Sequence, residues 1–120
     1  MHFGYNHHFD MNGCNNTTTA TVEAFITEAV GDLEWTLVGQ PSYTELHTDT
    51  PDGGYIYIQL LDRGYIIVQT RNTTNQLYLD LWTPTRTDDR TIQLLIVKHF
   101  NPTVRNINTR TRLAPMMDFE

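Results

Sequence analysis

The sequence predicts an α+β two-layer sandwich, in which one antiparallel sheet carries two helices on one face. Two segments, 17–33 and 85–100, have the apolar spacing of amphipathic helices. Shorter segments read as strands, and three of them follow one another between Gly53 and Pro84 with only short turns between them. The predicted order of elements is therefore β-α-β-β-β-β-α-β.

The composition is typical of one domain inside the cell. The 120 residues suffice for one core, and the net charge of −6 argues against binding nucleic acid through its phosphates. We expect a single domain at 1–113 and a C-terminal tail at 114–120. No apolar run approaches the roughly 20 residues that span a bilayer, and the start lacks a signal-peptide pattern. The single cysteine favours a reducing compartment. We therefore expect a cytoplasmic protein that binds neither nucleic acid nor membranes.

The N-terminal part predicts a strand followed by a helix. The segment from Tyr5 to Met11 alternates in the manner of a strand. Adjacent residues on a strand point to opposite faces, so His7 and His8 cannot easily share one ion, and we expect no metal site. The clearest helix is Thr17–Leu33, and Asn16 with the threonines after it can cap its start.

A second strand region and three consecutive strands come next. The region from Glu34 to Thr48 is interrupted at Gly39-Gln40-Pro41, because proline cannot donate to a ladder. The consecutive strands are expected at Tyr55–Leu61, Tyr65–Thr70 and Gln76–Trp82. The turns between them are expected at Asp62-Arg63-Gly64, where glycine would supply a positive φ, and at Arg71–Asn75.

Alternation along these three strands predicts which face the helices bury. Side chains repeat with a period of two, so the aliphatic residues are expected on the covered face, namely Ile56, Ile58, Leu60, Ile66, Val68, Leu77, Leu79 and Leu81. The other face then carries rings and polar groups, namely Tyr55, Tyr57, Gln59, Tyr65, Ile67, Gln69, Tyr78, Asp80 and Trp82. A partner sheet or a flat ligand would explain so many rings, and so would the preference of Tyr and Trp for strands. We expect a homodimer through this face, with Tyr55, Tyr57, Tyr78 and Trp82 at the contact.

The C-terminal part predicts one more helix and one more strand. The helix begins in the polar stretch 85–89, where acidic residues favour its positive end, and Asn101-Pro102 stops it. The alternating segment Thr103–Leu113 predicts a final strand near an edge of the sheet. Met116, Met117 and Phe119 in the tail could dock on a partner.

From Tyr5 to Arg112, the order of elements and three short strings resemble the bacterial-type S-adenosylmethionine decarboxylases. Members of that family begin with a strand ending in acidic-x-x-Gly-Cys, matched here by Asp10–Cys14. Their later hairpin ends in His-Thr, matched by Gln69-Thr70, and the next strand ends in Asp-x-Phe-Thr-Cys, matched by Asp80–Pro84. The resemblance implies an S-adenosylmethionine decarboxylase-like fold and a dimer whose two sheets stack into four layers.

The resemblance also locates the family's reaction in this chain. In the family, a serine in a Glu-Ser-His string becomes a pyruvoyl group, which serves as the electron sink for decarboxylation. In this chain, that string falls on Arg63, Gly64 and Tyr65. The serine and histidine that take part in the family's processing fall on Ile67 and Gln69. The family's catalytic cysteine falls on Pro84. The only serine in the chain is Ser42. The resemblance therefore implies a divergent member that lacks the pyruvoyl-forming serine, and we expect no pyruvoyl cofactor.

Three functions follow from these observations. The first is a decarboxylase-like pseudoenzyme that acts as a ligand-binding or regulatory paralogue. The resemblance implies that its ligand is S-adenosylmethionine or a related nucleoside. The candidate binding residues are Tyr65, Tyr78, Asp80 and Trp82. The second is an enzyme of the polyamine or S-adenosylmethionine pathway with different chemistry, using acid–base candidates among His7, His8, Asp10, Glu45, His47 and Asp62. The third is a structural self-assembly protein. We favour the first function, and whether any catalysis remains is open.

Overall fold

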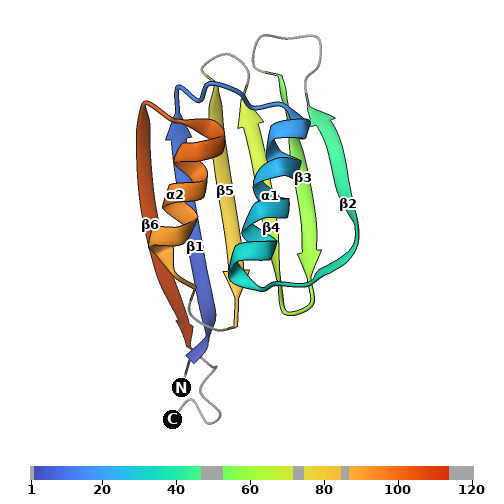
Figure 1. The fold of residues 1–120 in the computed structure, drawn as a ribbon, viewed down its shortest axis with the longest axis vertical. Helices are drawn as coiled ribbons and strands as arrows, with labels where there is room; N and C mark the ends of the chain where they lie inside the picture. Colours follow the sequence, from blue (N-terminus) through green and yellow to red (C-terminus); the bar gives the residue numbers. More distant parts are fainter. Residues whose placement is uncertain (1, 47–52, 72–74, 85–86, 114–120) are drawn as a thin grey trace, which may run out of the picture.

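The computed structural model describes residues 2–46, 53–71, 75–84 and 87–113. Its elements follow the predicted order: β1 (His2–Asn12), α1 (Thr19–Leu33), β2 (Leu37–Leu46), β3 (Gly54–Leu61), β4 (Gly64–Arg71), β5 (Gln76–Thr83), α2 (Asp89–Phe100) and β6 (Val104–Leu113). The strands form one sheet in the order β2-β3-β4-β5-β1-β6, and all neighbouring pairs are antiparallel. Both helices lie on the same face of the sheet (Figure 1). The predicted α+β two-layer sandwich is confirmed, and β6 is an edge strand as expected.

Helix α1 begins and ends at residues that satisfy its free backbone groups. The Thr18 hydroxyl accepts a hydrogen bond from the Thr21 amide at 3.3 Å, and the Asn16 side chain accepts one from the Thr18 amide at 2.9 Å. The helix ends at Glu34, which has a left-handed backbone with φ of 57°. Its buried stripe consists of Val22, Phe25, Ile26 and Ala29.

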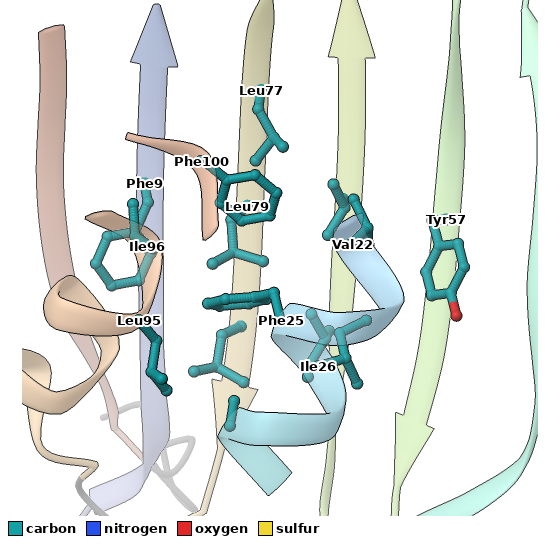
Figure 2. Packing of buried hydrophobic residues seen from close by; sticks show 14 of the residues in the cluster. Phe9, Val22, Phe25, Ile26, Tyr57, Leu77, Leu79, Leu95, Ile96 and Phe100 are labelled. Carbon is teal, nitrogen blue, oxygen red and sulfur yellow. The ribbon is translucent and has the colours of Figure 1, made fainter. Parts of the chain in front are cut away.

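Helix α2 covers the other half of the same face. Asp88 caps its start, and Asn101 ends it in a left-handed conformation just before Pro102. Its buried residues Ile92, Leu95, Ile96 and Phe100 meet the stripe of α1 and the leucines of β5 (Figure 2).

The structure reverses the predicted faces of β3. Tyr55 and Tyr57 are only 7% and 3% exposed and belong to the core on the helix-covered face, where Figure 2 shows Tyr57 beside α1. The aliphatic residues predicted to be buried, Ile56, Ile58 and Leu60, lie on the opposite face, and Leu60 is 52% exposed. On β4 and β5 the predicted buried residues Ile66, Val68, Leu77, Leu79 and Leu81 are in the core.

The length of one turn explains this reversal. Leu61 pairs directly with Gly64, so the β3–β4 loop consists of Asp62 and Arg63 only, whereas the sequence predicted a loop of three residues. A shift of register by one residue moves every side chain of a strand to the other face. Tyr57 therefore pairs with the buried Val68.

The buried tyrosines keep their hydroxyls at the rim of the core. The Tyr55 hydroxyl donates to the carbonyl oxygen of Thr17 at 2.6 Å. Burial raises the pKa of Tyr57, and the nearby carboxylate of Glu23 raises it further. Tyr55 and Tyr57 therefore contact α1 or its start, and their predicted place at a sheet-to-sheet dimer contact is wrong.

Candidate functional site

The face of the sheet that carries no helix, which we call the uncovered face, brings the four predicted binding residues together. Tyr65 pairs with Trp82, and Asp80 and Tyr78 follow at alternate positions of β5. All four side chains are partly exposed. The structure therefore places residues from two strands in one continuous patch, as the sequence predicted for these two strands.

Tyr65 and Trp82 form an aromatic platform in this patch. Their rings are nearly parallel, with an interplanar angle of 18° and centroids 6.4 Å apart. The indole of Trp82 lies over Gly4 of β1, because a Cβ atom at Gly4 would come within 2.6 Å of the ring. The missing side chain at Gly4 thus gives the indole its place on the sheet.

Asp80 lies between the platform and the polar strand β1. Its Oδ1 atom is 3.6 Å from His8 Nδ1 and accepts a long hydrogen bond of 3.4 Å from the Asn6 side chain. The Asp80 side chain is 35% exposed, so it retains oxygen atoms for a ligand. Asp10 lies two residues after His8 on β1, on the same face, and pairs with Tyr78 of β5. Two predicted acid–base candidates, His8 and Asp10, therefore border the predicted binding residues.

The part of the uncovered face over β2, β3 and β4 carries several aliphatic side chains among polar ones such as Ser42 and Gln69. Ile58 pairs with Ile67 at its centre, and Val38 pairs with Leu60 towards the edge. Val38 is 45% exposed. Exposed aliphatic side chains that gather on one face can mark an interaction site.

Position 64, where the resemblance places the pyruvoyl-forming serine, has no room for a side chain. A Cβ atom at Gly64 would collide with the carbonyl oxygen of Trp82 on the neighbouring strand. Its backbone does not have the predicted positive φ, which among the described glycines occurs only at Gly13 and Gly39. Gly64 is therefore required by close approach of two strands and not by turn conformation.

The other positions of the expected catalytic set fall into two groups. Ile67 and Gln69 lie on the uncovered face, opposite Asp80 and Tyr78. Arg63 and Pro84 instead line a cavity of about 380 Å³ at the end of the sheet. The side chains at these four positions and at Gly64 supply no hydroxyl, thiol or imidazole for a pyruvoyl-type reaction.

The remaining acid–base candidates do not converge. His7 is buried on the helix-covered side, where its Nδ1 atom lies 2.7 Å from Asp89 Oδ1 at the start of α2. Glu45 accepts a hydrogen bond from Tyr43 on β2, and Asp62 lines the cavity. His47 lies outside the described residues. The described part of the chain holds no group of three metal-ligating side chains.

Sequence reasoning missed two features next to the candidate sites. Asn6 contacts Asp80, which is 74 positions away in the sequence, and His7 contacts Asp89, which is 82 positions away. No local sequence pattern indicates such distant pairs. Cys14 is buried, and burial raises the pKa of its thiol to about 11, so it is a poor nucleophile.

Comparison with known proteins shows the fold. The crystal structure of the adenosylmethionine decarboxylase from Aquifex aeolicus VF5 is similar, with a TM-score of 0.73, 15% sequence identity, and coverage of 99% of this chain and 98% of that chain. This chain has the fold of that decarboxylase. No family model matches it, and no curated protein matches it. Neither α1 nor α2, the helices of the described residues, is long and apolar enough to cross a membrane.

Proposed function

We propose that this protein is a non-decarboxylating member of the adenosylmethionine decarboxylase scaffold and that it binds a nucleoside-type ligand on the aromatic platform. The observation that carries the proposal is the parallel Tyr65–Trp82 pair with Asp80 beside it on a face that no helix covers. The absence of space at Gly64 supports the lack of pyruvoyl chemistry. S-adenosylmethionine or a related adenine nucleoside is the ligand class.

The platform suits a flat heterocycle for simple physical reasons. A base that stacks on an aromatic side chain gains about 1–3 kcal/mol. Asp80 offers carboxylate oxygens near Trp82, and an exocyclic amino group of a purine could donate to them. The rings are fixed before binding because the indole is seated over Gly4, so little entropy is lost on association.

Titration with S-adenosylmethionine and with adenosine, followed by calorimetry and by Trp fluorescence, tests the ligand. A Trp35→Phe background leaves Trp82 as the single indole of the chain. Trp82→Ala, measured by calorimetry, should weaken binding about ten-fold or more, which corresponds to the loss of one stacking contact. Tyr43→Ala is the matched control, because it removes an exposed ring on the other face. Absence of heat and of quenching with both compounds would refute the nucleoside proposal.

The part of the uncovered face that carries these aliphatic side chains supports a second element of the proposal, a homodimer through stacked sheets. Ile58 and Ile67 lie at the centre of this surface, and Tyr78 and Trp82 border it. A second copy that packs sheet to sheet would bury the two isoleucines and leave the Tyr65–Trp82 platform near the rim of the contact. In the proposed dimer contact, Ile58 and Ile67 therefore take the place of Tyr55 and Tyr57, which are buried on the other face.

Two neighbouring substitutions on β3 test the dimer. Ile58→Asp places a charge in the proposed contact and should shift the protein to monomers in sedimentation velocity, with its circular dichroism unchanged. Tyr57→Asp places the charge in the core and should instead destabilise the fold. A parent protein that sediments as a monomer at all concentrations would remove the dimer from the proposal. A dimer without nucleoside binding would favour the self-assembly alternative.

A further inference from the structure

The most exposed large apolar side chains among the described residues gather at one edge of the sheet. Four of these five side chains lie on β2 or directly beside it on β3, namely Leu37, Val38, Tyr43 and Leu60. Leu37 and Tyr43 lie on the helix-covered face, since they pair with the buried residues Leu61 and Tyr57. Val38 and Leu60 pair with each other on the uncovered face. Apolar surface is thus exposed on both faces of the same edge, which Figure 1 shows beyond α1.

Strand addition covers both faces of such an edge at once. A sheet that packs on the uncovered face covers Val38 and Leu60 but leaves Leu37 and Tyr43 in water. A strand that pairs with β2 instead continues the sheet, so that its own side chains extend both faces. It also supplies partners for the backbone groups that an edge strand leaves unpaired. The exposure on both faces therefore indicates a partner that adds a strand to β2.

Two hydrogen bonds show how the backbone groups of β3 alternate between its neighbours. The Tyr55 amide donates to the Thr70 hydroxyl of β4 at 3.1 Å, so its N–H group points away from β2. The Asp62 amide, an odd number of residues later, donates to the carbonyl oxygen of Thr36, just before β2, at 2.9 Å. Both bonds fit the alternation of strand backbones in an antiparallel sheet. The even-numbered residues of β3 therefore face β2.

The pairing register transfers this alternation to β2. Thr44 pairs with Ile56, so the backbone groups of Thr44 face β3. Tyr43 and Glu45 lie on either side of Thr44, so their N–H and C=O groups face outwards. These outward groups form the start of a ladder for a further strand.

The bulge before this segment limits where a strand can be added. Residues 39–41 all lie opposite Gln59 of β3. The buried Gln59 side chain donates to the carbonyl oxygens of Val38 and Gly39, each at 3.4 Å, and so satisfies groups at the bulge. Pro41 has no N–H group to offer to a new strand. Because bulges and prolines of this kind protect sheet edges from pairing, the pairing segment begins after Pro41.

A second copy of this chain fits the open segment. In an antiparallel pair with a two-fold axis at Thr44, Tyr43 lies opposite the partner's Glu45, and Glu45 lies opposite the partner's Tyr43. Each of these two pairs then exchanges both of its N–H···O bonds through the outward groups. Within one chain the Tyr43 hydroxyl donates to the Glu45 carboxylate at 2.7 Å, and a carboxylate can accept a further bond across the axis.

Other registers of this pair are less favourable. An axis at Glu45 would place two carboxylates directly opposite each other, which is destabilising. An axis at Tyr43 would place Glu45 opposite the partner's Pro41, which has no N–H group. We infer that β2 is a self-association edge at which two copies of this chain pair antiparallel about Thr44 and join their sheets. The contact is small and therefore weak, so it forms at higher concentration than the stacked dimer, on which it does not depend.

A dilution series of the Ile67→Asp protein, followed by ¹H–¹⁵N correlation spectra, tests this pairing. The substitution places a charge in the proposed sheet-to-sheet contact, two strands away from β2, so failure of the stacked dimer leaves the result unchanged. Between about 20 µM and about 1 mM, the amides of Tyr43, Thr44 and Glu45 should shift in a saturable manner. In a sample of mixed isotope labelling, an NOE should join the Thr44 Hα atoms of the two copies, because non-hydrogen-bonded pairs bring their Cα atoms close together. Amide positions that do not change with concentration would overturn the inference.

Proline variants at neighbouring positions separate pairing from folding. Glu45→Pro removes an outward N–H group and should weaken the pairing about ten-fold or more. Glu45→Ala keeps the N–H group and is the matched control, which should still pair and should unfold at the same urea concentration as Glu45→Pro. Thr44→Pro removes an N–H group that faces β3 and should instead lower the urea midpoint. Pairing of Glu45→Pro with the affinity of Glu45→Ala would overturn the inference.

Discussion

Replacing Gly64 by serine is the sharpest test of the relation between this chain and pyruvoyl chemistry. The change supplies the hydroxyl that the reaction would need at the position where the resemblance places it. A Cβ atom at position 64 would lie much closer to the carbonyl oxygen of Trp82 than 3.0 Å, a distance below which real Cβ atoms essentially never approach another atom. It would also lie 3.1 Å from the carbonyl carbon of Trp82. These atoms belong to the backbone of β5 and cannot rotate away. We therefore expect loss of stability without gain of self-cleavage.

The size of this loss follows from the kind of contact. Overpacking in a well-packed region costs about 1–3 kcal/mol, and a clash with backbone belongs at the upper end of this range. With a urea m-value of about 1–3 kcal/mol/M, the unfolding midpoint should fall by about 1–3 M. Urea unfolding followed by circular dichroism measures the shift, and intact mass spectrometry should show one species near 13.9 kDa.

The matched control for this change is Gly31→Ser. Gly31 lies in α1, and a Cβ atom there would meet nothing within 4 Å. Serine is also a slightly better helix former than glycine, so this variant should be at least as stable as the parent. The reasoning is refuted if Gly64→Ser unfolds at the same urea concentration as the parent, or if its mass spectrum shows two fragments that meet between Arg63 and position 64.

Three further predictions concern titratable groups outside the candidate sites. Cys14 should resist iodoacetamide at pH near 8 in the folded protein and react in urea, because burial raises its pKa to about 11; labelling at equal rates in both states would contradict this. Hydrogen bonds from Lys98 and His99 lower the pKa of Glu28 below its usual 4.5, so its contribution to stability is present above that pH and is lost as the pH falls through the folded pKa. Thermal unfolding of Glu28→Gln across the acid range should therefore show a weaker pH dependence than that of the parent. His7→Ala should lower the unfolding free energy by about 2–4 kcal/mol, because it opens a cavity and removes the partner of Asp89; Asp89→Asn, which keeps an acceptor oxygen, should lose less in urea unfolding.

The order of the elements could be predicted because its signals are local. The apolar stripe of α1, the capping residues around Thr18 and Asp88, and the Asn101-Pro102 stop all act within one or two turns of chain. The interruption at Gly39-Gln40-Pro41 also has a structural counterpart, a register shift between Val38 and Ser42 while β2 continues. These local sequence signals predict the helices and their ends correctly because no contact with a distant part of the chain overrides them.

The faces of β3 could not be predicted because the strand is apolar on both sides. Its tyrosines and its isoleucines each form a plausible buried row, so alternation alone leaves two solutions. The choice depends on whether the turn has two or three residues, and Asp62-Arg63-Gly64 is compatible with both. The pairing of Leu61 with Gly64 decides it, since buried Val68 then requires Tyr57 on its own side.

The composition of the candidate sites was only partly predictable for a related reason. Tyr65, Trp82 and Asp80 lie on the consecutive strands β4 and β5, and their common face followed from alternation. The cavity instead joins Glu34 to the turn at Arg63 and to Thr87, through contacts that depend on how the helices are placed on the sheet. No periodicity within a single segment encodes that placement.

The glycine at position 64 and the aromatic platform are linked through Trp82. The backbone of Trp82 leaves no space for a side chain at position 64, and its indole leaves none at Gly4. A chain with serine at position 64 would have to move β5 away from β4 at this point, which would lift the indole from its seat on β1 and separate it from Tyr65. The platform and the pyruvoyl-forming residue therefore exclude each other in this packing. Under the proposed function, glycines at both positions allow the close packing that seats the Tyr65–Trp82 pair, and the same packing is a physical reason to expect no pyruvoyl reaction on this scaffold.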